Sequence, residues 1–139
     1  MPALRTAAVL AAAALLTGGC STVDRVTGTV DSAATTVRVC ATATTAVTGT
    51  FARVADTVAT ARPGHLQQTQ RDLGAEFTAL HARLQPLIDQ ASDADVKTAL
   101  TELDRRVRGW ADRPQSFLGV DKATVDGLVA GLRKACGPS

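Results

Sequence analysis

The side chains best suited to chemistry in this chain are three cysteines and two histidines. Cys20, Cys40, Cys136, His65 and His81 are of the residue types that bind zinc, and two cysteines can instead form a disulfide. No CxxC spacing, the usual pattern of redox and zinc sites, occurs in the chain. The choice between these chemistries depends on what surrounds the cysteines and on the elements that position them.

Cys20 ends a short apolar segment. Arg5 precedes the apolar run at residues 7–16, which is too short to span a bilayer and is typical of a signal-peptide core. The sequence LTGGC at residues 16–20 resembles the lipobox of bacterial lipoprotein precursors. This resemblance implies that residues 1–19 are a signal peptide and that Cys20 is acylated. The protein is then exported and lipid-anchored on the extracytoplasmic face of the cell membrane. An ordinary secretory signal cleaved near the same point is the alternative.

The resemblance to a lipobox also implies how many cysteines are available to form a disulfide. If Cys20 carries the lipid, Cys40 and Cys136 remain as a pair in an oxidising compartment, where a disulfide is expected.

The charge balance argues against a nucleic-acid partner. Removal of residues 1–19 takes Arg5 from the 15 Lys and Arg residues, so 14 basic residues stand against 13 acidic ones in a mature chain of 120 residues. That length suits a single domain. The basic cluster is interspersed with acidic residues, which is typical of a solvated helix face (Arg105, Arg106 and Arg108, with Glu102, Asp104 and Asp112).

Candidate catalytic groups are few. Asp72 and Glu76 form an i, i+4 carboxylate pair, but no apolar surroundings are expected to bury them. No serine stands in a strand–turn–helix elbow, and neither histidine neighbours a plausible nucleophile. We therefore expect no enzymatic activity and no cofactor.

Hydrophobic spacing predicts helices throughout the mature chain. Residues 23–58 carry an apolar seam with a 3.5-residue period, although their many threonines and valines leave a β-hairpin as the alternative. A turn at Pro63-Gly64 precedes a second helix that ends near Ala91 and contains Pro86. The expected seam of the first helix is Val23, Val26, Val30, Ala33, Val37, Cys40, Thr44, Val47, Phe51, Val54 and Val58.

Two further helices follow. Ser92, with Asp95 three residues later, predicts the cap of a third helix that ends at Arg113-Pro114. Asp121 predicts the cap of a fourth, which ends at Gly137. The residues expected to point inward from the last three helices are Leu66, Leu73, Phe77, Leu80, Leu84, Leu87, Ala91, Val96, Leu100, Leu103, Val107, Trp110, Val125, Leu128, Val129 and Leu132.

Short connections predict an up-down-up-down antiparallel four-helix bundle at residues 36–139, preceded by a stalk or tether at residues 20–35. Helix lengths at about 1.5 Å per residue bring Cys136 to the level of Cys40. The same lengths keep His65 and His81 away from both cysteines, so we expect no metal site.

The aromatic residues are expected at one level of this bundle. Residue counting brings Phe51, Phe77, Trp110 and Phe117 together, either as a core layer or as the lining of an apolar pocket. We therefore expect a non-enzymatic interaction or structural module whose partner is another envelope protein or a second copy of itself. A carrier or sensor with an apolar ligand inside the bundle is the alternative.

Overall fold

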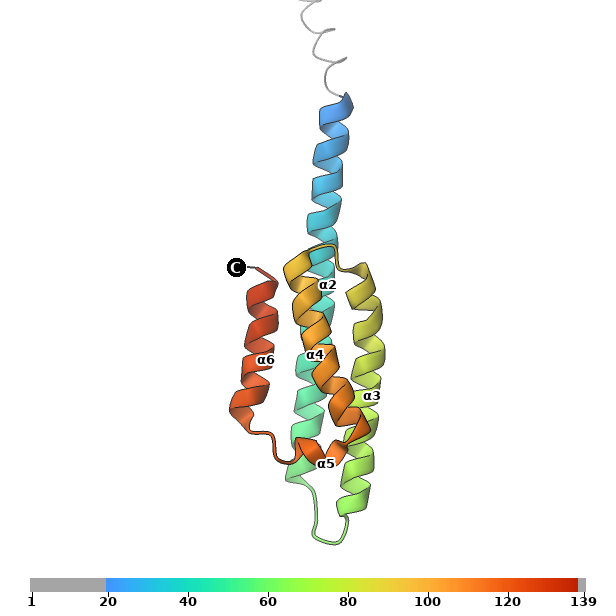
Figure 1. Ribbon diagram of the computed structural model, residues 1–139, viewed down its shortest axis with the longest axis vertical. Coiled ribbons are helices and arrows are strands. Elements are labelled where there is room, and N and C mark those ends of the chain that lie inside the picture. Colours follow the sequence, from blue (N-terminus) through green and yellow to red (C-terminus); the bar gives the residue numbers. More distant parts are fainter. Residues whose placement is uncertain (1–19, 138–139) are drawn as a thin grey trace, which may run out of the picture. The chain divides into compact units, whose positions relative to one another are not determined.

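A computed structural model describes residues 20–137, with side chains described from Ser32 onward. All regular structure in this part of the chain is helical (Figure 1), which confirms the expected all-α class there. The expected signal peptide, residues 1–19, lies outside the described residues. The chain divides after Ala34 into two units, and every side-chain contact discussed below lies in the second. The helices are α2 (Cys20–Ala59), α3 (Leu66–Gln90), α4 (Ala94–Asp112), α5 (Pro114–Phe117) and α6 (Lys122–Ala135).

Helix α2 forms despite its many threonines and valines, so the β-hairpin alternative is wrong. The hydroxyl groups of Thr48, Thr57 and Thr60 each donate to the backbone carbonyl four residues earlier, at 2.7–3.0 Å. In this arrangement the helix itself satisfies the hydroxyl. The side chains that α2 buries are those of Val39, Cys40, Ala43, Val47, Thr50 and Val54.

The buried face of α2 differs from the expected 3.5-residue seam. Val37 and Val58 belong to that seam but are 68% and 39% exposed, whereas Val39 and Ala43 are fully buried. A sequence pattern with a 3.5-residue period drifts by about 20° per heptad around an ordinary α-helix, which turns every 3.6 residues. Among the described side chains, from Ser32 onward, the seam therefore faces the core only between Cys40 and Val54.

The turn between α2 and α3 forms as expected. Gly64 has a φ of +92°, in the left-handed region that glycine tolerates. Helix α3 then buries the leucines and phenylalanine predicted for its inner face, except that Leu66, in its first turn, is 53% exposed. Pro86 lies inside α3, close to its end.

The cap of α4 is one residue later than expected. The Oδ1 atom of Asp93, not the hydroxyl of Ser92, accepts hydrogen bonds from the backbone N–H groups of Asp95 (2.9 Å) and Val96 (3.0 Å). Asp is as good an N-cap as Ser, and here it satisfies two of the free N–H groups at the helix start.

Helix α5 was not expected from the sequence, whereas the start of α6 was. Pro114 occupies the first position of α5, where its missing N–H group has no helical partner to lose. The Oδ1 atom of Asp121 caps α6 by accepting from the hydroxyl (2.6 Å) and the backbone N–H (2.8 Å) of Thr124. These two bonds, the hydroxyl first, hold the pKa of Asp121 below its usual value of 3.8.

Helix α4 packs against α3 and α6, and α5 packs against both α3 and α4 (Figure 1). Helix α2 is joined to α3 by an ion pair between Arg53 Nε and Glu76 Oε2 at 2.9 Å. The four expected inward residues of α6 are buried unequally: Leu132 is 2% exposed, but Val125, Leu128 and Val129 are only half-buried. Helix α6 therefore lies at the margin of the core.

Candidate functional site

Cys40 and Cys136 are paired in a disulfide, and their Cα atoms lie 5.7 Å apart. The bond connects the middle of α2 to the residue that follows α6. Cys40 is 8% exposed and belongs to the core, while Cys136 is half-buried. The expected proximity of these two residues is confirmed.

Cys20, the expected lipidation site, is the first residue of α2. Its side chain lies outside the part of the chain whose side chains are described. Lipid attachment at Cys20 therefore stays a prediction. Over residues 20–137, no helix combines the length and the apolar character needed to cross a bilayer.

The four aromatic rings lie together, and each ring is close to the other three. Phe77 is fully buried and Trp110 is 6% exposed, while Phe51 and Phe117 are half-buried. Ring centroids are separated by 4.9 Å (Phe77–Phe117) to 6.4 Å (Phe51–Phe77 and Phe51–Phe117), with the Phe77–Trp110 pair at 5.3 Å. These spacings are typical of aromatic packing in protein interiors.

This aromatic cluster, defined by Phe51, Phe77, Trp110 and Phe117, takes one residue from each of α2, α3, α4 and α5. Most of its pairs are edge-to-face or tilted, the arrangements that aromatic rings prefer in protein interiors. Phe51 and Trp110 also line two separate grooves that open to the surface. The arrangement is that of a core layer with two rings at its edges.

A buried polar cluster was missed in the sequence. Asp104 was expected on a solvated face of α4 but is 5% exposed. Its Oδ1 lies 2.7 Å from His81 Nδ1, and its Oδ2 accepts a hydrogen bond from Gln85 Nε2 at 2.8 Å. The spacing of Asp104 could have indicated its burial, because it stands four residues after Leu100 and three before Val107, on the apolar stripe of α4.

In this cluster Asp104 bonds to both His81 and Gln85. A buried carboxylate fixes the orientation of an imidazole ring that is 32% exposed. The hydrogen bonds described for His81 involve only Asp104, so no hydroxyl or thiol nucleophile is placed on the ring by them. The two carboxylates weighed in the sequence are elsewhere on α3: Glu76 pairs with Arg53, and Asp72 accepts from Gln68.

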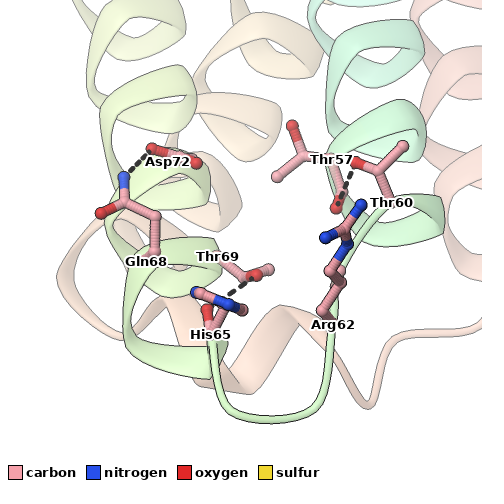
Figure 2. A pocket seen from close by; sticks show the side chains of 8 residues that line it. Thr57, Thr60, Arg62, His65, Gln68, Thr69 and Asp72 are labelled. Atoms are coloured by element: carbon pink, nitrogen blue, oxygen red, sulfur yellow. Dashed lines mark hydrogen bonds between the residues drawn. The ribbon is translucent and has the colours of Figure 1, made fainter.

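A polar pocket of about 330 Å³ lies at the α2–α3 turn (Figure 2). The hydroxyl groups of Thr57 and Thr60 donate to carbonyl groups of α2, and that of Thr69 donates to the carbonyl of His65. Gln68 Nε2 donates to Asp72 Oδ1 at 2.8 Å. The polar side chains that line the pocket are thus largely engaged with their own helices. Its lining residues are Thr57, Thr60, Ala61, Arg62, His65, Gln68, Thr69 and Asp72.

A second groove, of about 550 Å³, runs along α2 and is closed at one side by Arg83 of α3. Small side chains form its floor, so a partner could approach the α2 backbone closely. Arg53 stands at one end of the groove and is paired with Glu76. We call this surface the α2/α3 groove; its lining residues are Ala41, Thr42, Thr45, Ala46, Gly49, Arg53 and Arg83.

The two histidines have different surroundings. His65 precedes the first residue of α3, and His81 lies against Asp104. Among the side chains that the structure describes, residues 32–137, no group of three or more His, Cys, Asp or Glu is arranged to hold a metal ion. No protein-family model matches the chain, and no curated protein or solved structure is detectably similar to it.

Proposed function

We propose that this protein is a non-enzymatic lipoprotein, exported and anchored by an acylated Cys20 on the extracytoplasmic face of the cell membrane. The proposal rests on the LTGGC sequence at residues 16–20 and the short apolar run before it. Two acyl chains on one cysteine give stable attachment, where a single chain gives only reversible binding. Residues 20–35 are then the tether between the lipid and the domain at residues 36–139.

We infer that α2, α3, α4 and α6 form an up-down-up-down antiparallel four-helix bundle. The packing of α4 against both α3 and α6, the Arg53–Glu76 ion pair and the Cys40–Cys136 bond support this arrangement. The short helix α5 is part of the connection between the third and fourth helices of the bundle.

The bundle serves as an interaction or structural module that presents its helical surface to another envelope protein or to a second copy of itself. The observation that carries this proposal is the packing of the aromatic cluster. Its four rings fill the level at which an internal ligand would lie, and Phe77 is fully buried among them. The larger apolar openings, such as the α2/α3 groove, are on the surface.

Anchoring is tested by replacing Cys20. We expect the full-length protein to incorporate labelled palmitate and to partition with membranes, and Cys20→Ser to do neither. A Cys40→Ser variant, which keeps the lipobox, is the matched control and should still be labelled. A wild-type protein whose Cys20 is unmodified by mass spectrometry would overturn the proposed anchor.

The module is tested by in-cell crosslinking of the anchored protein. Thr45→Arg places a long cation on the floor of the α2/α3 groove, and Thr98→Arg places the same side chain on an exposed part of α4 outside it. We expect a crosslinked band of defined mass to be lost in Thr45→Arg and retained in Thr98→Arg.

The carrier alternative makes a different prediction for the same protein. An organic extract of the purified protein should then yield about one apolar molecule per chain, beyond the covalently attached lipid. Such a finding, together with the absence of any crosslinked partner, would contradict the interaction module and support the carrier function.

A further inference from the structure

Helix α6 is attached to the rest of the domain differently from the other long helices. Of its side chains only Leu132 is fully buried. The hydrogen bonds and the ion pair described for α6 stay within the helix and its cap, as with Lys122–Asp126 at 2.8 Å and Asp121–Thr124. By contrast, α3 buries six residues and forms polar bonds with both α2 and α4.

One covalent bond compensates for this weak attachment. The Cys40–Cys136 disulfide lies at the end of α6 and ties it to a core residue of α2. Local stability in a protein follows buried apolar contacts and protected hydrogen bonds, so the element with fewest of them opens first. A helix of 14 residues is also marginal in water once it is separated from its packing surface.

We propose that the Cys40–Cys136 disulfide is a redox latch that holds α6 on the domain. When a dithiol reductant opens the bond, α6 detaches and unfolds locally, while α2, α3 and α4 stay folded around the aromatic cluster. This inference concerns the conformational states of the chain itself and does not depend on the proposed function.

The opening reaction requires two electrons, which the dithiol supplies. One of its thiolates attacks the sulfur of Cys136, the more exposed of the two residues, and the Cys40 sulfur leaves as a thiolate that takes up a proton. The second thiol of the reductant then attacks the mixed disulfide. It releases Cys136 as a thiol, and the reductant becomes a cyclic or intramolecular disulfide.

Detachment also changes the surface of the domain. Val125 and Val129 of α6 line a groove together with Phe51 of the aromatic cluster. Release of α6 removes these side chains from the groove and uncovers the apolar ring of Phe51. The reduced protein should therefore bind an apolar dye that the oxidised protein binds weakly.

The test is amide hydrogen exchange, read by mass spectrometry, on the full-length protein in detergent before and after treatment with dithiothreitol. We expect reduction to accelerate exchange at the amides of α6 at least about tenfold more than at those of α3 and α4, which lose only the share of protection that the bond gives to global stability. The Cys40→Ser/Cys136→Ser double variant should show the same pattern without reductant.

Two matched variants separate release of α6 from general destabilisation. Leu132→Ala weakens the packing of α6 but keeps the bond, so the oxidised variant should retain more α6 protection than the reduced wild type. Leu80→Ala removes a fully buried side chain of α3 and should accelerate exchange in all helices together. If reduction accelerates α3, α4 and α6 equally, or leaves α6 unchanged, the latch does not exist.

Discussion

At the scale of single residues, Trp110 is a central part of the interior. It contacts the other three rings of the aromatic cluster and is 6% exposed. Truncation would remove both the buried area of the indole and three ring contacts, and the rigid helices around it cannot close the gap.

We expect Trp110→Ala to lower the free energy of unfolding by about 3–5 kcal/mol. Urea denaturation followed by far-UV circular dichroism measures this, since the variant lacks the indole signal. Leu118→Ala, at a residue that is 41% exposed, is the control and should change stability by only a few tenths of a kcal/mol. Equal effects of the two substitutions would contradict the packing of the cluster.

The Asp104 cluster leads to a second prediction at this scale. His81→Ala leaves a buried carboxylate with only Gln85 as its partner, which should cost about 1–3 kcal/mol of stability. His65→Ala, at an exposed residue before α3, should have little effect.

A double-mutant cycle isolates the bond itself. When Asp104→Leu is combined with His81→Leu, the loss should be smaller than the sum of the two single losses, because no buried polar group then lacks a partner. Strict additivity in the urea-unfolding free energies would show that the two side chains do not interact.

The predictions for single residues are correct where the number of residues along each helix is enough to place a side chain. The convergence of the four rings and of Cys40 with Cys136 follows from helix lengths, which depend only on residue count. The burial of Asp104 was not predicted. Its charge led to the expectation of a solvated residue, although it stands on the apolar stripe of α4. The partners that make its burial acceptable come from α3, and a pattern within one helix does not show them.

At the scale of the elements, the absence of a side chain at Gly74 lets α3 and α5 pack closely together. A Cβ atom at this position of α3 would lie 3.1 Å from Pro114 Cγ, at the start of α5. The rigid proline ring has little freedom to move aside. The close contact therefore seats α5, and with it Phe117, against α3.

Two glycine-to-alanine substitutions test this contact. Gly127→Ala, in the middle of α6, adds a methyl group that meets no atom within 4 Å beyond the neighbouring residues and backbone of its own helix. It should stabilise the protein by up to about 1 kcal/mol through helix propensity. Gly74→Ala should give less than that or destabilise, because the methyl group presses on Pro114. Similar gains in melting temperature for both variants would show that α5 is free to shift.

The element boundaries show where local signals are reliable. Asp121, Pro63-Gly64 and Gly137 fix the ends of helices through capping and positive-φ chemistry, and the structure follows them. Helix α5 was not predicted because a segment of four residues is too short to show a hydrophobic repeat. The exposure of Val37 and Val58 was missed because a 3.5-residue pattern and a 3.6-residue helix diverge along α2.

At the scale of the whole molecule, the disulfide makes a large contribution to the stability of the fold. The bond closes a loop with a sequence separation of 96 residues. In the chain-entropy model a loop of this size contributes up to about 4.7 kcal/mol by restricting the unfolded chain. That is a large part of the roughly 5–15 kcal/mol typical of a domain.

We expect the Cys40→Ser/Cys136→Ser variant to unfold at a substantially lower urea concentration than the oxidised wild type. The comparison is made on the global transition, followed through Trp110 fluorescence, because that ring lies outside α6. Dithiothreitol should shift the wild type to the midpoint of the variant and leave the variant unchanged. An unchanged midpoint in reduced wild type would show that the bond contributes nothing to global stability.

The same bond gives the chain an unusual response to cutting. Between Cys40 and Cys136 the oxidised polypeptide is a closed covalent ring. A protease that cuts this ring once opens it without releasing a fragment, since one new end remains in the peptide chain of Cys40 and the other remains joined to Cys40 through the disulfide. If Cys20 is acylated, a singly nicked domain stays at the bilayer until a reductant arrives. A single cleavage sheds the domain directly only when it falls between Cys20 and Cys40.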